Sequence, residues 1–337
     1  MNFDVFENSK ILITGASGLI GGTLVRLLAQ RVKNVTIVAQ VRNKAKAETL
    51  FNESERKKIE YLEGDVCEMP LPDMGVEYVI HAASMTASAD FINRPVEVMK
   101  VAVEGTRRVM EFSRVNKIKS AAYLSSMEVY GAPQSEEKIY ETAPTNLQTT
   151  TPRSAYPESK RLCECMCAAY HAEYNVPVKI VRLTQTFGEG VSYADKRVFA
   201  EFSRCVIEGR DIVLKTKGET KRNYLYTGDA ATAILTVLTS GKDGEAYNAA
   251  NEETYCSIYE MARLVADTFG NGKCTVKIEE RDAASLGYAP TLRMNLSARK
   301  LNELGWEAKV GLKEMFARTI RSMKYGKETV EELCQKE

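Results

Sequence analysis

Residues 14–22 read T-G-A-S-G-L-I-G-G, and this stretch decides the fold. Gly15 and Gly18 follow a short apolar run, and Gly21 lies at the start of a segment with helical periodicity that begins at Leu19. Glycines at such a strand-to-helix junction permit a tight turn, close approach of the backbone to a phosphate, and close packing of helix on strand. The amides and the positive dipole end of the helix then face a pyrophosphate. The stretch therefore predicts a dinucleotide-binding loop.

Short apolar runs alternate with helical patterns on the C-terminal side of this loop. Such alternation is typical of a parallel sheet with helices on both faces. We therefore expect an α/β fold, a Rossmann-type doubly wound parallel sheet with a smaller, interwoven C-terminal substrate lobe. Strands are expected at residues 10–14, 35–41, 59–62, 78–81, 121–125 and 178–183, and helices at 19–30, from about 43, at 95–114 and at 154–174.

The rhythm changes after residue 187. Helical patterns occupy 197–208, 229–238, 257–269, 297–304 and 312–325, with short extended runs at 212–214, 223–226 and 246–248. We expect residues 1–186 plus 223–250 to form the NAD(P)-binding Rossmann domain and residues 187–222 plus 251–330 to form the substrate lobe.

The composition narrows the class of protein. The chain has 337 residues, 44% of them hydrophobic, which is enough for a substantial core and about two domains. Its 46 Lys and Arg nearly balance 45 Asp and Glu, so it lacks the one-sided basic field of non-specific nucleic-acid binders. No signal peptide and no membrane-length apolar run is seen. We expect a cytoplasmic protein with no nucleic-acid or membrane partner.

The eight cysteines, without a secretory signal, indicate reduced thiols. Cys163, Cys165 and Cys167 fall in a helical pattern, where alternate residues point in different directions. Zinc motifs normally place paired ligands on turns, so these cysteines are interpreted as small packing residues. With only two histidines in the chain, we expect no metal site.

The end of the second strand reads V-A-Q-V-R-N at residues 38–43 and contains no carboxylate to hold ribose hydroxyls. Arg42 could pair with a 2′-phosphate, which would mean NADP, or it could be a solvated residue at the start of a helix. Gln40 could hydrogen-bond an unphosphorylated ribose. We predict NAD and leave NADP open. Asp65 follows the third strand and is placed to meet the adenine end.

Residues 156–160 read Y-P-E-S-K, and Tyr156 and Lys160 share one face of a helix. A phenol has an ordinary pKa of about 10, but a nearby ammonium and the cationic nicotinamide of an oxidised cofactor both favour the phenolate. The pair can then take a proton from a sugar hydroxyl while hydride leaves the same carbon. Such pairs are common on amphipathic helices. The catalytic interpretation of Tyr156 and Lys160 therefore depends on the presence of the glycine loop and of Ser126 in the same chain.

Together these features resemble the extended short-chain dehydrogenase/reductase family, the NAD(P)-dependent nucleotide-sugar epimerases, dehydratases and decarboxylases. The resemblance runs from about Lys10 to about Arg321. It is carried by residues 14–21, V-I-H-A-A at 79–83, S-S-M-E-V-Y-G at 125–131, Y-P-E-S-K at 156–160, K-R-N-Y-L-Y-T-G-D at 221–229 and L-G-W at 304–306.

The resemblance implies a role for Ser126 as the catalytic serine, whose hydroxyl would bond the same sugar oxygen that Tyr156 deprotonates. It implies that Arg222 and Arg281 bind the diphosphate of the substrate; either could instead be a surface ion pair. The other implied substrate-binding residues are Ser84, Thr86, Gln185 and Arg197. The implied cofactor-binding residues, besides those discussed above, are Ser17, Leu19, Ile20, Val66, Ala82 and Ala83.

Glu128 matches an acid found two residues after the catalytic Ser or Thr in the dehydratases and decarboxylases of the family. The resemblance implies a second base there, acting at carbon 5 of a 4-keto sugar. The alternative is a buried carboxylate bonded to loop amides. Met127 stands where dTDP-glucose 4,6-dehydratase-like members place a proton-donating Asp, which weakens that assignment without excluding it. Gln185, Ala102 and Asn295 also depart from common family residues, and the segment 182–187 looks closest to UDP-glucuronate decarboxylase-like members.

The sequence thus predicts an epimerase or dehydratase of a nucleoside-diphosphate sugar that works through a transient 4-keto sugar. A decarboxylase or a keto-sugar reductase remains an alternative, and the reductase would consume NADPH stoichiometrically. A non-catalytic nucleotide-binding sensor is a third reading, against which the joint presence of Ser126, Tyr156 and Lys160 argues. The helices at 95–114 and 154–174 resemble the dimer seam of the family, so we expect a homodimer.

Overall fold

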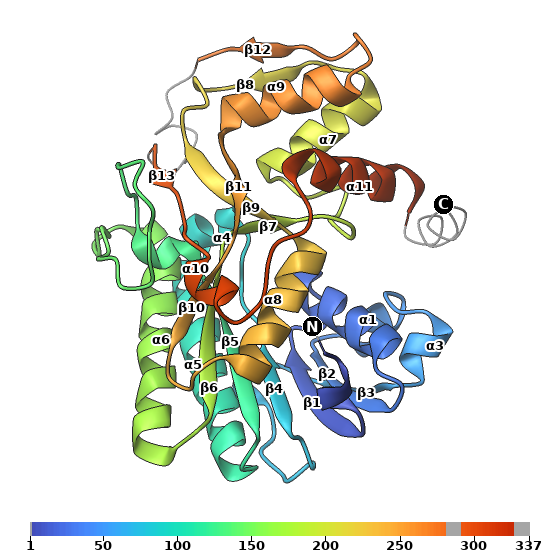
Figure 1. Ribbon diagram of the computed structural model, residues 1–337, viewed down its shortest axis with the longest axis vertical. Helices are drawn as coiled ribbons and strands as arrows, with labels where there is room; N and C mark the ends of the chain where they lie inside the picture. The colour runs from blue at the N-terminus through green and yellow to red at the C-terminus, as the bar shows by residue number, and fades with distance from the viewer. Residues whose placement is uncertain (1, 281–290, 327–337) are drawn as a thin grey trace.

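The computed structural model describes residues 2–280 and 291–326 and contains a seven-stranded parallel sheet (Figure 1). The strand order is β10-β6-β5-β4-β1-β2-β3, and every neighbouring pair in it is parallel. This order reverses direction between β1 and β4, which is where doubly wound sheets bind their ligands. The strands are β1 (Ser9–Thr14), β2 (Val35–Val41), β3 (Ile59–Glu63), β4 (Tyr78–His81), β5 (Ser120–Ser126), β6 (Val178–Leu183) and β10 (Ala246–Ala249).

Helices cover both faces of this sheet, which confirms the expected fold class. On one face, Ile11 and Ile13 of β1 pack in a cluster with α1 (Leu19–Arg31) and α8 (Thr227–Ser240). On the other face, Leu12 packs in a cluster with α5 (Pro95–Val115) and α6 (Ala155–Tyr174). Successive strand residues point to opposite faces, so apolar side chains in an unbroken run serve both cores.

Two predicted helices differ from those observed. The helix expected from about residue 43 is two short ones, α2 (Lys44–Glu48) and α3 (Glu53–Arg56), because Asn52 caps a new helix together with Glu55. The helix expected at 297–304 is reduced to α10 (Arg299–Asn302).

A second lobe forms the upper part of Figure 1. Its sheet contains β11 (Asn251–Ser257), β9 (Lys221–Tyr226) and β13 (Arg293–Met294), with β7 (Gln185–Phe187) also paired to β9. A separate pair joins β8 (Ile212–Leu214) to β12 (Val276–Ile278). The core of the lobe includes buried aromatic side chains of Phe187, Phe199, Phe202 and Phe316 and draws on the helices α7 (Val198–Glu208), α9 (Ile258–Phe269) and α11 (Leu312–Tyr325).

The chain passes between the lobes more than once. Strand β10 lies in the seven-stranded sheet, whereas β9 lies in the sheet of the second lobe, so the predicted boundary at residue 223 falls within β9. The division of the chain into two domains otherwise stays a prediction.

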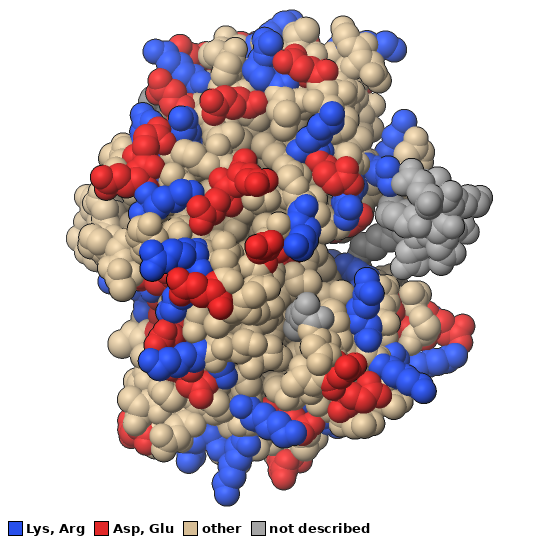
Figure 2. Space-filling view, in the orientation of Figure 1, with Lys and Arg blue, Asp and Glu red and all other residues tan. Residues whose placement is uncertain are grey.

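The face drawn in Figure 2 carries basic and acidic side chains interspersed, in keeping with the balanced charge of the sequence. In the described part of the chain, no helix combines the length and apolar character that crossing a bilayer requires.

Candidate active site

The loops that follow β1, β4 and β5 meet at one edge of the sheet, because these parallel strands are neighbours in the order β5-β4-β1. They carry the glycine loop, the segment Ala82–Thr86 and the pair Ser126 and Glu128. These predicted residues therefore share the carboxyl ends of three neighbouring strands, whereas Tyr156 and Lys160 come from α6, and Arg42, Asp65 and Val66 follow β2 and β3.

The glycine loop packs too tightly for side chains at two of its glycines. Gly15 has a φ of +66°, and a Cβ there would lie 2.8 Å from the Cα of Ala83. A Cβ on Gly21 would lie 2.3 Å from the carbonyl oxygen of Gly15. The loop thus brings bare backbone from β1, α1 and the end of β4 together, as a dinucleotide cradle requires.

The first turn of α1 is open to an anion. Its N-cap is Gly18, and no side chain caps the helix, so the amides of this turn remain for a ligand. Ser17 is exposed beside it, and Leu19 and Ile20 are half-buried. These residues fit a bound pyrophosphate.

A buried histidine links the two strands that flank this cradle. Nδ1 of His81 lies 2.7 Å from Oγ1 of Thr14, and its Nε2 lies 3.2 Å from Oγ1 of Thr106. Burial lowers the pKa of His81 to about 3, so the ring is neutral at pH 7. Oγ1 of Thr14 also accepts from the amide of Ala83 at 3.1 Å. This bridge could not be predicted from spacing, because Thr14 and Thr106 are far apart along the chain.

Gln40, at the end of β2, forms hydrogen bonds with the backbone. Its Oε1 accepts from the amide of Gly15 at 3.4 Å and its Nε2 donates to the carbonyl of Gly64 at 2.6 Å. Both polar ends of this buried side chain therefore bind backbone. Asp65 and Arg42 are exposed nearby; the pKa of Asp65 is lowered by a hydrogen bond from the backbone of Cys67 and, more weakly, by the charge of Arg42.

Val66, another predicted cofactor residue, is buried at the start of η2 (Val66–Glu68) and packs in the core. A Cβ on Gly105 of α5 would lie 3.0 Å from its Cγ1. The structure thus shows a packing contact for Val66.

Lys160 is held on the α6 face that covers the sheet. Its Nζ donates to the carbonyl of Leu124 at 2.8 Å and lies 4.9 Å from the ring centroid of Tyr123 and 5.8 Å from that of Tyr156. Burial lowers the pKa of Lys160 to about 8. The ammonium is therefore mostly charged at pH 7 and close to the predicted phenol.

Tyr156 is buried and surrounded by groups with opposing effects. Burial raises its pKa well above the ordinary value, and the charge of Glu128 raises it further. A hydrogen bond with Ser126 and the positive charges of Arg153 and Arg197 lower it. The chain by itself holds Tyr156 as a neutral phenol, which differs from the phenolate expected when an oxidised cofactor is bound.

Glu128 forms an ion pair that the sequence did not predict. Its two carboxylate oxygens accept from Nη1 and Nη2 of Arg153 at 2.8 and 3.1 Å, with both side chains about three-tenths exposed. In the alternative reading the carboxylate bonds to loop amides, whereas the structure pairs it with this guanidinium. Glu128 lies in η3 (Met127–Tyr130) and Arg153 in η4 (Pro152–Ser154). The sequence indicated only that a half-buried carboxylate needs a hydrogen-bonding or charged partner, and it did not identify Arg153 as that partner.

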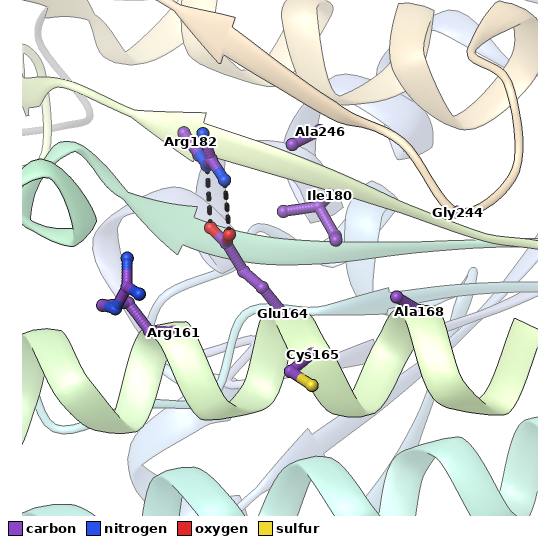
Figure 3. A pocket seen from close by; sticks show the side chains of 8 residues that line it. All are labelled: Arg161, Glu164, Cys165, Ala168, Ile180, Arg182, Gly244 and Ala246. Carbon is purple, nitrogen blue, oxygen red and sulfur yellow. Dashed lines mark hydrogen bonds and ion pairs between the residues drawn. The ribbon is translucent and has the colours of Figure 1, made fainter. Parts of the chain in front are cut away.

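Behind Ser126, a polar network fixes the end of β5. Ser125 donates to Oε1 of Glu164, and Arg182 donates to both oxygens of Glu164 at 2.9 and 2.6 Å. Arg182 also donates to the hydroxyl of Tyr130 at 2.8 Å. Tyr130 follows Glu128 in the same short helix, η3. Figure 3 shows the Glu164–Arg182 pair in a hollow between α6 and the β6–β10 edge. This hollow is lined by none of the predicted catalytic residues, so we interpret the network as structural support.

The predicted substrate residues are placed as follows. Gln185 and Arg222 are brought together across β7 and β9, with Nη1 to Oε1 at 3.5 Å, and the Nε of Arg222 is buried without a hydrogen-bond partner. Arg197 pairs with Asp195 at 2.5 Å. Ser84 is half-buried and Thr86 exposed, whereas Arg281 lies outside the described residues.

Met127, between Ser126 and Glu128, packs in an apolar cluster. Met127 is 4% exposed, and its sulfur accepts from Oγ1 of Thr184 at 3.4 Å. Within the described ranges, no cluster of three or more His, Cys, Asp or Glu could hold a metal ion. Cys163 and Cys167 are buried in the core, while Cys165 is exposed.

Comparisons with known proteins agree on one family. The model of the NAD dependent epimerase/dehydratase family matches residues 11–250. Human dTDP-D-glucose 4,6-dehydratase is 26% identical over 323 residues, covering 92% of this chain and 89% of that protein. UDP-glucuronic acid decarboxylase 1 of Xenopus tropicalis is 28% identical over 321 residues, covering 93% of this chain and 72% of that protein.

Solved structures share the fold. UDP-N-acetylglucosamine 4-epimerase from Methanobrevibacter ruminantium M1, in complex with UDP-N-acetylmuramic acid, superposes with a TM-score of 0.81 at 17% identity, covering 94% of this chain and 98% of that one. dTDP-glucose 4,6-dehydratase from Bacillus anthracis, in complex with NAD, gives a TM-score of 0.78 at 19% identity, covering 95% and 98%.

Proposed function

Because the chain belongs to the NAD dependent epimerase/dehydratase family, we propose that it binds NAD and converts a nucleoside-diphosphate sugar through a transient 4-keto intermediate. The observation that carries the proposal is that Ser126, Tyr156 and Lys160 meet at the carboxyl end of β5, in the same sheet as β1, which leads into the glycine loop. Curated relatives named as dehydratases and decarboxylases of nucleotide sugars support the substrate class.

In this proposal Tyr156 takes the proton of the sugar's 4-hydroxyl while the hydrogen on carbon 4 leaves as hydride. Ser126 hydrogen-bonds the same oxygen, and the ammonium of Lys160 favours the ionised phenol. NAD, when bound, would supply a hydride acceptor that is regenerated within each cycle, so no net oxidation would result. The glycine loop and the open first turn of α1 would hold the pyrophosphate of the cofactor.

The cofactor preference remains a proposal. The exposed carboxylate of Asp65 would disfavour a second phosphate, whereas Arg42 would attract one. We propose NAD on the strength of the family description and of the relatives solved with it. Direct titration with NAD and NADP distinguishes the two.

Glu128 would act after the first step. Once carbon 4 is a ketone, the neighbouring carbon 5 is acidified, and a carboxylate can remove or return its proton. Arg222 and Gln185 of the second lobe would contact the nucleoside diphosphate. The planar guanidinium of Arg222 can donate two hydrogen bonds to phosphate oxygens, and its buried Nε has no hydrogen-bond partner within the chain. Arg197, Ser84 and Thr86 remain proposed substrate contacts.

Incubating the purified protein with a panel of UDP and dTDP sugars, without added cofactor, tests the proposal. Loss of water, loss of carbon dioxide or an unchanged mass identifies dehydration, decarboxylation or epimerisation. Met127 cannot donate a proton to a leaving 6-hydroxyl, which favours decarboxylation or epimerisation over 4,6-dehydration. Stoichiometric consumption of NADPH would instead indicate a keto-sugar reductase, and nucleotide binding with no turnover a sensor.

We also propose a homodimer formed through α5 and α6. These neighbouring helices share a buried core with each other, yet both also present exposed apolar side chains. Val96 and Met99 of α5 are 79% and 45% exposed, and Leu162 of α6 is 51% exposed. A second copy would cover them. A cytoplasmic location stays a prediction from the cysteine usage of the sequence.

A further inference from the structure

Arg153 lies next to the proposed proton-transfer groups and contacts one of them, Glu128. It lies in the short η4 turn directly before α6. The hydroxyl of Ser154 donates to the carbonyl of Gln148 at 2.5 Å and lies 2.9 Å from that of Thr151, which braces the turn on both sides of Arg153. These hydrogen bonds hold the backbone turn that carries Arg153.

The guanidinium is engaged along its edge and on its face. The edge binds Glu128 through two hydrogen bonds, and the face lies 5.0 Å from the ring centroid of Phe91 in α4 (Ser88–Asn93). Phe91 in turn stacks on Tyr156, with centroids 4.2 Å apart and planes 13° from parallel. One cation thus touches both Glu128 and the ring that supports Tyr156.

This arrangement answers an electrostatic conflict. A carboxylate beside Tyr156 opposes ionisation of the phenol, yet the proposed chemistry needs both groups as bases on one sugar. The charge of Glu128 does raise the pKa of Tyr156, and the charge of Arg153 lowers it. Without the guanidinium, the charge of Glu128 would leave a smaller fraction of Tyr156 ionised at a given pH.

We propose that Arg153 is a positioning residue that allows Tyr156 and Glu128 to serve as bases in the same site. The inference rests on the proposed function, in which both act on one sugar. Glu128 takes the proton of carbon 5, and the electron pair of that bond moves into the carbon 4 carbonyl. The neutral acid then holds Arg153 less tightly, and the fork re-forms when the proton returns to carbon 5.

The test compares Arg153→Met, Arg153→Lys, Glu128→Gln and the double variant Arg153→Met/Glu128→Gln with the wild type. Arg263→Met is the matched control, because Arg263 is an exposed arginine paired with Asp267 on α9. The first readout is the pH midpoint of single-turnover hydride transfer with a nucleotide sugar that the wild type converts. The second is the pH titration of the Tyr156 signal in ¹³C-tyrosine-labelled protein bound to NAD, assigned with Tyr156→Phe.

Arg153→Met should raise both midpoints by roughly one pH unit, which slows hydride transfer about tenfold below the midpoint. Glu128→Gln should lower them, and Arg153→Lys should fall between Arg153→Met and the wild type. The double variant should recover hydride transfer at the wild-type pH while failing to exchange the carbon 5 hydrogen with deuterated water. Arg263→Met should change nothing.

Unshifted midpoints in Arg153→Met, or a double variant as slow as Arg153→Met, would mean that Arg153 only supports the fold and would overturn the inference. If Arg153→Met does not fold, an unshifted midpoint in Glu128→Gln overturns it equally. Failure of the wild type to convert any nucleotide sugar would count against the proposed function instead, and the tyrosine titration in the NAD complex would still decide the role of Arg153.

Discussion

Among single residues, the candidate site gathers groups that are costly to bury. Lys160 is 4% exposed and Tyr156 7% exposed. In the proposed reaction, Lys160 carries a positive charge and Tyr156 becomes negatively charged. Burial of Lys160 disfavours its ammonium and lowers its pKa to about 8. Sites that keep such groups for chemistry do so at the expense of stability.

Lys160→Met should therefore stabilise the folded chain at pH 7. The pKa of Lys160 is about 8 in the fold against an ordinary 10.5, so below pH 8 the ammonium is charged in both states and the folded state bears the full burial penalty. At about 1.4 kcal/mol per pH unit, removing it should raise the free energy of unfolding by up to about 3 kcal/mol, less the hydrogen bond to Leu124. Urea unfolding at pH 7 measures the difference.

The advantage of Lys160→Met should shrink as the pH rises from 8 to 10.5. In that window the unfolded wild type binds more protons than the folded one, so the wild type gains stability relative to the variant. Unfolding both proteins at pH 7 and pH 10 measures the change, and a difference independent of pH would contradict it.

Tyr156→Phe removes the proposed base and leaves the stack on Phe91 intact. We expect hydride transfer to fall by about 10²–10⁴-fold with NAD still bound at wild-type affinity. Single-turnover absorbance of reduced cofactor measures the first and titration calorimetry the second. Unimpaired turnover would exclude Tyr156 as the base.

The sequence was informative about residues whose spacing is local. Tyr156 and Lys160 share a helix face, and Ser126 ends a strand, so their pairing follows from short-range geometry. Arg153 and Glu128 meet because a loop of more than twenty residues folds back between η3 and η4. Spacing does not encode such a contact, and side-chain direction at the loop ends was needed to find it.

At the scale of elements, the junction of β1 and α1 decides whether a cofactor can bind. Gly21 sits in the first turns of α1 against the carbonyl of Gly15, so helix, loop and strand end touch without side chains between them. A Cβ on Gly22, the next residue, would lie 3.4 Å from the carbonyl oxygen of Ala16, which is an ordinary contact distance.

Gly21→Ala should weaken NAD binding and lower stability, because its Cβ would lie 2.3 Å from the oxygen of Gly15 and the loop must shift. Gly22→Ala is the matched control. Its Cβ has room, and replacing a helical glycine should stabilise the chain by roughly 0.5–1 kcal/mol with cofactor affinity unchanged. Calorimetry and thermal melts of both variants check this, and equal affinity for NAD in both would show that the tight contact is unimportant.

Element boundaries followed local signals well where capping or prolines marked them. α5 begins at Pro95, and β4 spans the residues that its apolar run predicted. The strands of the second lobe were harder to predict, because β7, β11 and β13 are short or polar and exist by pairing with β9. Their partners are distant in the chain, so periodicity alone could not reveal them.

For the whole molecule, the proposed dimer explains the apolar surface of α5 and α6. Leu162→Glu should place a charge in the seam and convert a dimer to a monomer of half the mass. Ile278→Glu is the control, since Ile278 is 46% exposed on β12 of the second lobe. Light scattering after size-exclusion chromatography measures both, and an unchanged mass for Leu162→Glu would place the interface elsewhere or nowhere.

The passage of the chain from β9 through α8 to β10 has a consequence for engineering and ancestry. β10, the last strand of the seven-stranded sheet along the chain, follows β9, which belongs to the sheet of the second lobe. Neither lobe is therefore formed by one contiguous segment. A graft that swapped specificity between relatives would have to exchange several separated segments at once. New substrates in such a scaffold should therefore arise by point substitutions on loops, and fragments cut near residue 186 should fail to fold alone.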